Sequence, residues 1–162
     1  MPNHSAKPLL AALLACSMLG NAQSQVFPEG NGIAFANVSQ FDLYVEVNRW
    51  HGMAGDATSF RLDTQRLLEA SLREIGASRR PASRHHLVCR LQARLDGEQV
   101  SYSSTLEYWG MQSTDVHSLL WRQGDVHVST AIGFTPGLIA DQCAGYFQAE
   151  WSKWNSVSEK GW

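Results

Sequence analysis

The stretch RHHLVCRLQARLDGEQVSYSSTLEYW, residues 84–109, decides the fold. Its middle holds Asp96-Gly97, a dipeptide favoured in two-residue hairpin turns because both central residues take positive φ. We therefore expect an antiparallel hairpin in which Leu95 faces Glu98. Side chains alternate along a strand, so the remaining pairs divide between two faces. The expected pairs are Ala93 with Val100, Leu91 with Tyr102, Cys89 with Ser104 and Leu87 with Leu106 on one face, and Arg94 with Gln99, Gln92 with Ser101, Arg90 with Ser103, Val88 with Thr105 and His86 with Glu107 on the other.

The first of these faces is mainly apolar and the second is mainly polar, in a single register. A slip of one residue would turn one strand over and mix the two faces. The hairpin therefore predicts a sheet with one buried face and one face in water.

The sequence before the hairpin predicts a strand and a helix. Residues 41–47 alternate between apolar and polar side chains, as a half-buried strand does. Residues 51–57 hold two glycines and are expected to form a loop. A helix follows, with Asp63 as its N-terminal cap and Gly76 just past its end.

The sequence after the hairpin predicts two further strands and a last helix. Residues 110–115 are expected to form a loop. Residues 116–122 and 126–130 are predicted to pair across Gln123-Gly124. Thr135-Pro136 is typical of a helix start, because the missing N–H of proline costs nothing in the first turn. On a helical wheel, Glu150 falls inside the apolar face of this helix; it is expected to reach water or an arginine, or else to act as a functional buried acid.

These elements predict one α+β domain at residues 41–155. We expect a largely antiparallel sheet of four to five strands with two helices packed on one face. Residues 23–40 are expected to be a loose leader and residues 156–162 a tail.

Residues 1–22 have the pattern of a signal peptide. Lys7 precedes an apolar run that is too short to span a membrane, and small residues follow at Gly20-Asn21-Ala22. We expect cleavage before Gln23. The alternative is a bacterial lipoprotein box ending at Cys16, where the cysteine would be lipidated. Either route predicts an exported protein, periplasmic or anchored to the outer membrane.

Cys89 and Cys143 are the only cysteines that remain after signal cleavage. Both are predicted to point inward, Cys89 from the hairpin and Cys143 from the last helix. Exported proteins meet oxidising conditions, which favours a disulfide between them. The alternative is two buried free thiols.

The sequence holds no motif that predicts a catalytic site, a metal site or a cofactor. His-Glu-x-x-His, Cys-x-x-Cys, a nucleophile elbow and a phosphate loop are all missing.

The chain has 13 basic and 15 acidic residues, a slightly acidic balance that argues against a nucleic-acid partner. We expect no enzyme activity. Two rival functions stay open: a small hydrolase using His51 and Asp56 with a serine such as Ser59, and a carrier of an apolar ligand lined by Tyr102, Tyr108 and Phe147.

The polar face of the hairpin is the predicted binding surface. It carries Arg84, His86, Arg90, Arg94 and Trp109, with Arg84 expected across from Trp109 at cation–π distance. A merely solvated sheet face is the alternative. We expect this surface, or the loop at residues 51–56, to bind an envelope protein or a cell-wall component.

The order of the elements resembles small exported α+β proteins of bacteria whose function is uncharacterised. The matching residues are Leu67 to Gly76, Leu87 to Leu95, LLWRQG at 119–124 and CAGYFQAEWSKWN at 143–155. In element order alone, the chain is also similar to the amino-terminal domain of the Tol translocation protein B and to curli-secretion lipoproteins. The resemblance implies a non-catalytic periplasmic protein and carries over no site residues.

Overall fold

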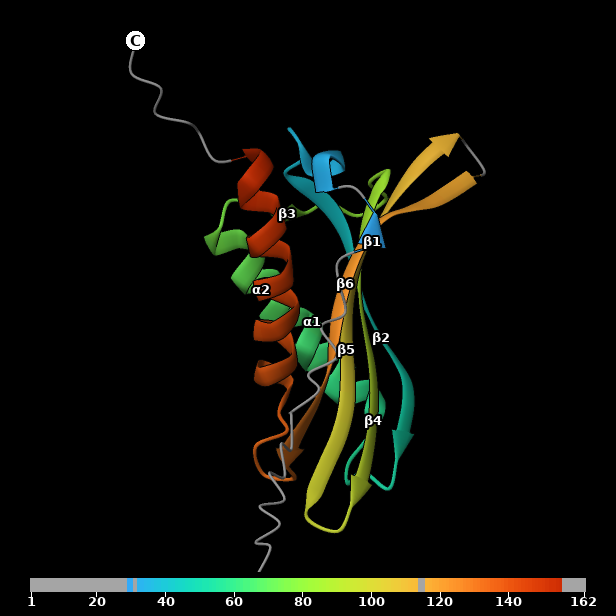
Figure 1. Cartoon of the computed structure of the whole chain (residues 1–162), viewed down its shortest axis with the longest axis vertical. Coiled ribbons are helices and arrows are strands. Elements are labelled where there is room, and N and C mark those ends of the chain that lie inside the picture. Colours follow the sequence, from blue (N-terminus) through green and yellow to red (C-terminus); the bar gives the residue numbers. More distant parts are fainter. Residues whose placement is uncertain (1–28, 31, 114–115, 156–162) are drawn as a thin grey trace, which may run out of the picture.

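The computed structural model describes residues 29–30, 32–113 and 116–155; the expected signal peptide, Cys16 and the expected tail at 156–162 lie outside them. Within these described residues, nine elements follow one another (Figure 1). They are β1 (Glu29–Gly30), the 3₁₀ helix η1 (Gly32–Phe35), β2 (Gln40–His51), α1 (Ala57–Glu74), β3 (Ser78–Arg79), β4 (His85–Asp96), β5 (Gln99–Ser113), β6 (Val116–Thr130) and α2 (Pro136–Asn155).

Four long strands form the sheet, and a two-residue strand pairs at each edge. The strand order is β1-β6-β5-β4-β2-β3. β4, β5 and β6 are antiparallel neighbours, whereas β2 runs parallel to β4 and reaches it through α1. Both helices lie on the same face of the sheet (Figure 1). The predicted α+β fold, with a largely antiparallel sheet and two helices on one face, is confirmed.

The central hairpin forms with the predicted faces but with different partners. Leu95 pairs with Val100, and every pair is displaced by two residues from the expected register. The turn is Gly97-Glu98 rather than Asp96-Gly97; Gly97 has φ +61° and Glu98 stays at negative φ. Glycine at the first central position is the pattern of a type II′ turn, which also matches the twist of the strands. Because the displacement is an even number, Leu87, Leu91 and Leu106 still face the core, where each is at most 1% exposed.

The second predicted hairpin does not exist. Residues 116–122 and 126–130 belong to the single strand β6, which pairs with β5 along its length. Gly124 lies within the strand, where the backbone of β5 comes close: a Cβ at this position would lie 2.7 Å from the Ser104 carbonyl oxygen. The glycine therefore marks a close approach of two strands and not a turn. The expected loop at 110–115 is also wrong at its start, since β5 continues to Ser113.

Helix α1 begins seven residues earlier than expected, because Asp56 and not Asp63 caps it. The Asp56 carboxylate accepts hydrogen bonds from the backbone N–H and the hydroxyl of Ser59, at 2.9 and 3.0 Å. The end of the helix is as predicted. Gly76 has φ +89°, and the Gly76 and Ala77 N–H groups donate to the carbonyls of Arg73 and Leu72. These two bonds form a Schellman motif.

The segment around Phe35, expected to be part of a loose leader, packs into the core. The Phe35 side chain is fully buried and stacks on Tyr108 with ring centroids 4.2 Å apart. The end of α2 holds the same segment, since Asn155 donates to the Phe35 carbonyl and Trp151 donates to the Val38 carbonyl. A single buried phenylalanine produces no periodic pattern in the sequence. The sequence therefore did not show that the domain begins before residue 41.

Helix α2 starts as predicted and is bonded covalently to the sheet. The Thr135 hydroxyl accepts from the Leu138 N–H at 3.2 Å. Cys143 forms the predicted disulfide with Cys89, with Cα atoms 6.2 Å apart, and both residues are fully buried. The partner of Cys89 across the hairpin is Leu106 and not Ser104, which follows from the displaced register.

We predict that removing this disulfide destabilises the fold by about 4 kcal/mol, because it closes a loop with a sequence separation of 54 residues. Urea unfolding of a chain that begins at Gln23 should be compared with that of the Cys89→Ala/Cys143→Ala variant. Thiol counting on the unfolded, unreduced chain should find no free thiol. Two free thiols would contradict the prediction.

We also predict that Phe35→Ala lowers the free energy of unfolding by about 3–5 kcal/mol, because the ring is fully buried among other aromatic rings. The measurement is chemical unfolding monitored by circular dichroism. Ile33→Ala, at a side chain that is 52% exposed, is the control and should change stability far less. An equally small effect of Phe35→Ala would mean that the leader does pack loosely.

Candidate functional site

The candidate site is the face of the sheet opposite the helices, which we call the open face (Figure 1). No described element covers it. Three hollows lie along it and share lining residues, so they form one row. The histidine hollow is lined by Tyr44, Glu46, His86, Val88, Arg90, Trp109 and His117. The central hollow is lined by Arg90, Gln92, Ser103, Thr105, Glu107, Arg122, Gly124, Asp125 and Val126. The arginine hollow is lined by Arg49, Trp50, His51, Gln92, Ala93, Arg94, Ser101, Tyr102, Ser103 and Val126.

An ion-pair network holds the middle of the row in place. Arg90 donates from Nε to Glu107 at 2.9 Å and from its other end to Glu46. Glu107, only 7% exposed, also accepts from the Trp109 indole N–H at 2.8 Å. The hydrogen bond to Glu107 raises the pKa of Arg90. The charge of Arg90 is thus already balanced by two carboxylates, and the Trp109 ring has a fixed position.

The histidine hollow holds two imidazole rings, one of which stacks on a tyrosine ring. His86 stacks on Tyr44 with ring centroids 5.9 Å apart, and the His117 ring lies 5.0 Å from it. Burial lowers the pKa of His86, and the charge of His117 lowers it further. Both effects favour the neutral imidazole of His86, whose buried Nε2 has no hydrogen-bond partner in the described part of the chain.

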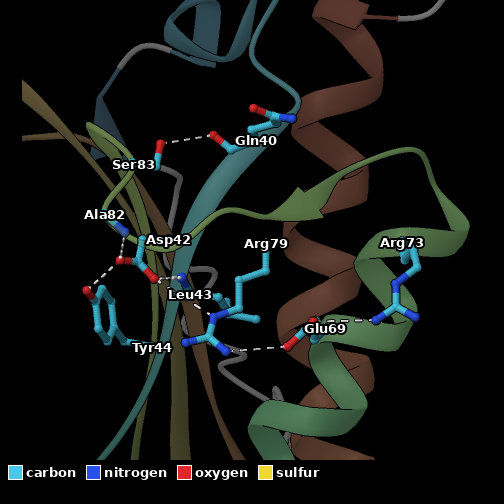
Figure 2. A network of polar contacts seen from close by, with 9 residues as sticks. All are labelled: Gln40, Asp42, Leu43, Tyr44, Glu69, Arg73, Arg79, Ala82 and Ser83. Atoms are coloured by element: carbon cyan, nitrogen blue, oxygen red, sulfur yellow. Dashed lines mark hydrogen bonds and ion pairs between the residues drawn. The ribbon is translucent and has the colours of Figure 1, made fainter.

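A buried carboxylate sets the position of Tyr44 and of the chain that leads into β4 (Figure 2). Asp42 accepts from the Tyr44 hydroxyl at 2.8 Å, the Ala82 N–H at 2.9 Å and the Leu43 N–H at 3.0 Å. The hydrogen bond with Asp42 raises the pKa of Tyr44. Ala82 has φ +58°, a left-handed conformation that costs free energy in a non-glycine residue, and the bond to Asp42 helps to hold it.

Arg79 connects this region to α1 (Figure 2). Its guanidinium lies 3.9 Å from Asp42 and 3.8 Å from Glu69, which also pairs with Arg73. These partly exposed pairs are individually weak, so we assign them a supporting role in joining β3 to the helix.

A β-bulge creates the arginine hollow. Between Val47 and Arg49 the register of β2 against β4 shifts, and Asn48 is left without a partner. Because one residue is inserted, Arg49 and His51 fall on the open face beside Gln92 and Arg94. Trp50 turns to the helix side, where its ring packs on Phe60 and Phe134.

The structure brings together most of the predicted surface residues. His86, Arg90 and Trp109 line the histidine hollow, and Arg94 lines the arginine hollow. Arg84 lies outside all three hollows, and the residue opposite Trp109 is His86, so the predicted pairing of Arg84 with Trp109 is wrong. The predicted pair of His86 with Glu107 is wrong for the same reason: the register is displaced by two.

Sequence reasoning missed Tyr44 and Arg49 as site residues. Tyr44 alternates outward from the predicted strand at 41–47, so the pattern could have placed it on this face. Arg49 lies beyond the bulge, where alternation predicts the wrong face, and no sequence signal marks the bulge.

The residues of the hydrolase hypothesis have other roles. The Asp56 carboxylate caps α1, and the backbone N–H of Ser59 is the first cause that lowers its pKa. A carboxylate with a lowered pKa is a weak general base. His51 ends β2 and forms no hydrogen bond with Asp56 or Ser59 in the described structure.

The polar groups beneath α2 are also used structurally. Ser104 is fully buried and donates to Gln142, which in turn donates to the Tyr102 hydroxyl.

Glu150 is 7% exposed and accepts from Lys153 at 2.6 Å and from the Trp154 indole at 3.0 Å. Burial works to raise the pKa of Glu150, but these hydrogen bonds bring it below its usual value. Glu150 thus pairs with a lysine rather than with an arginine, and its carboxylate joins two side chains of the last turns of α2.

The residues of the carrier hypothesis are part of the core. Tyr108 and Phe147 are fully buried and Tyr102 is 4% exposed. Burial raises the pKa of Tyr108, whose hydroxyl bonds to His85 and to the Ala34 carbonyl. Of these three residues, Tyr102 also lines the arginine hollow, whereas Tyr108 and Phe147 line none of the three hollows described above.

The described residues show neither a cluster of metal ligands nor a helix suited to cross a membrane. They contain no group of three or more histidine, cysteine, aspartate or glutamate side chains arranged to hold a metal ion. None of the described helices combines the length and the apolar character that a membrane crossing requires.

No protein-family model matches this chain, and no curated protein matches it. Among solved structures, the chain is similar to the PelC dodecamer from Paraburkholderia phytofirmans in space group P6, with 10% sequence identity and a TM-score of 0.45, over 71% of this chain and 90% of that one. A leucine-to-methionine variant of that PelC dodecamer, in space group C2, gives the same identity and TM-score over 71% of this chain and 89% of that one.

We predict that Glu107→Ala destabilises the protein by about 1–3 kcal/mol, because it leaves the Arg90 guanidinium and the Trp109 indole without their shared acceptor. Denaturant unfolding measures the change. Glu46→Ala removes the more exposed carboxylate, with a side chain 43% exposed, and should cost less than about 1 kcal/mol. Equal losses for the two variants would contradict the role given to Glu107.

Proposed function

We propose that this chain is an exported, non-enzymatic protein that binds another component of the bacterial envelope through its open face. The observation that carries the proposal is the row of three joined hollows on a sheet face that no described element covers. Concave hollows lined by a few polar groups are the shape that binding sites commonly take. The pattern of residues 1–22 supports export.

The side chains along the row are held in place before any partner arrives. Glu107 fixes Arg90 and Trp109, and Asp42 fixes Tyr44. Binding therefore costs little side-chain entropy at these positions, which favours affinity. The same features support binding rather than catalysis, because the charged groups neutralise one another instead of leaving an activated nucleophile or base.

Site-specific photo-crosslinking tests the proposal. A photoreactive amino acid at Ser101, an exposed position in the arginine hollow, should crosslink an envelope component when the full chain is made in its native bacterium. The same amino acid at Ala70, exposed on α1, is the matched control and should give no such product.

Two outcomes would contradict the proposal. Crosslinking from Ala70 but not from Ser101 would move the binding surface to the helix side. Turnover of an ester or a peptide that is lost in His51→Ala would replace the binding function with an enzymatic one.

A further inference from the structure

The arginine hollow differs in charge from the rest of the open face. Arg49 and Arg94 are both exposed there, and within the described residues neither has a carboxylate within ion-pair distance. No aspartate or glutamate lines this hollow, which has a volume of about 660 Å³. Arg90, by contrast, is paired with both Glu46 and Glu107. The guanidinium charge that a ligand can use is therefore concentrated at one end of the row.

The β-bulge at Asn48 is what builds this end of the row. It places Arg49 beside Gln92 and His51 beside Arg94 on the two neighbouring strands. Arg49 and Arg94 are then diagonal neighbours on adjacent parallel strands and line the same hollow, so their long side chains can reach a shared ligand. Ser101, opposite Arg94 on β5, adds a hydroxyl to the same hollow.

The chemistry of the hollow selects an anion. An arginine without a carboxylate partner presents a planar fork of N–H donors that matches the two oxygens of a carboxylate. Gln92 and Ser101 supply neutral hydrogen-bonding groups between the two arginines. Two separate forks fit a ligand that carries more than one carboxylate.

The surroundings of the hollow favour a protein segment over a sugar chain. Val126 borders it with 64% of its surface exposed, and Val128, two residues further along the same strand, is 63% exposed. Sugars stack on exposed aromatic faces. Trp50 and Tyr102 also line the hollow, but their rings pack against Phe134 on the helix side. Exposed valines next to arginines match a segment in which acidic and apolar side chains alternate.

We propose that the arginine hollow binds an extended acidic segment of a partner protein, with carboxylates of that segment on Arg49 and Arg94 and apolar side chains on Val126 and Val128. This inference rests on the proposed function, because it specifies the partner class of the same open face.

Binding of a short fluorescent peptide of alternating glutamate and valine tests the inference. Its affinity for the full chain, measured by fluorescence anisotropy, should fall at least about tenfold in Arg49→Gln/Arg94→Gln, since hydrogen bonds to charged groups contribute most to such contacts. Affinity should also fall as salt is raised. Both arginines are exposed, so the variant should keep the circular dichroism spectrum of the native chain.

The control is Arg66→Gln/Arg73→Gln, which removes the same charge from α1, where the two side chains are 76% and 69% exposed. It should leave the affinity unchanged; an equal loss would reduce the effect to net charge and overturn the inference. Failure of the peptide to bind, or tighter binding of an oligogalacturonate, would also overturn it. If Ser101 crosslinks a partner equally well in Arg49→Gln/Arg94→Gln, the acidic segment is wrong while the proposed function stands.

Discussion

The disulfide between Cys89 and Cys143 is the constraint on which the arrangement of layers depends. It joins the middle of β4 to the middle of α2, with both cysteines fully buried. Around it, the apolar side chains of the long strands are covered by the two helices. Strand side chains alternate, so a sheet that buries one face in this way must present its other side chains on the opposite face. The open face is thus a direct consequence of how the core is closed.

The sequence predicted the faces of the strands better than it predicted their partners. Alternation has a period of two, so the hairpin kept every face although its register was displaced by two residues. Turn chemistry decided the register, and the competition between Asp96-Gly97 and Gly97-Glu98 could not be resolved from a dipeptide preference alone. At Gly124 the prediction of a turn was itself wrong. Glycine was interpreted as a turn, whereas the close approach of β5 is what requires it.

The candidate site was predictable as far as regular alternation holds. His86, Arg90 and Arg94 follow the period of β4 and were placed on the correct face. Arg49 was not, because the bulge at Asn48 inserts one residue and reverses the alternation that follows. Arg90 was predicted as a contact residue, but two carboxylates from neighbouring strands already pair with it. Such cross-strand neighbours depend on register, which the sequence did not determine.

The β-bulge links side-chain packing on the helix side to the charge on the open face. The same inserted residue turns Trp50 toward Phe60 at the start of α1 and Phe134 before α2, and turns Arg49 and His51 away from them. With regular alternation after Val47, Arg49 would point under the helices, where an unpaired charge is costly, and Trp50 would lie in water. The aromatic contacts of Trp50 and the exposure of Arg49 therefore favour the same irregular backbone. Packing on the helix side thus holds Arg49 on the open face beside Arg94, which regular alternation along β4 already places there, independently of any partner that binds.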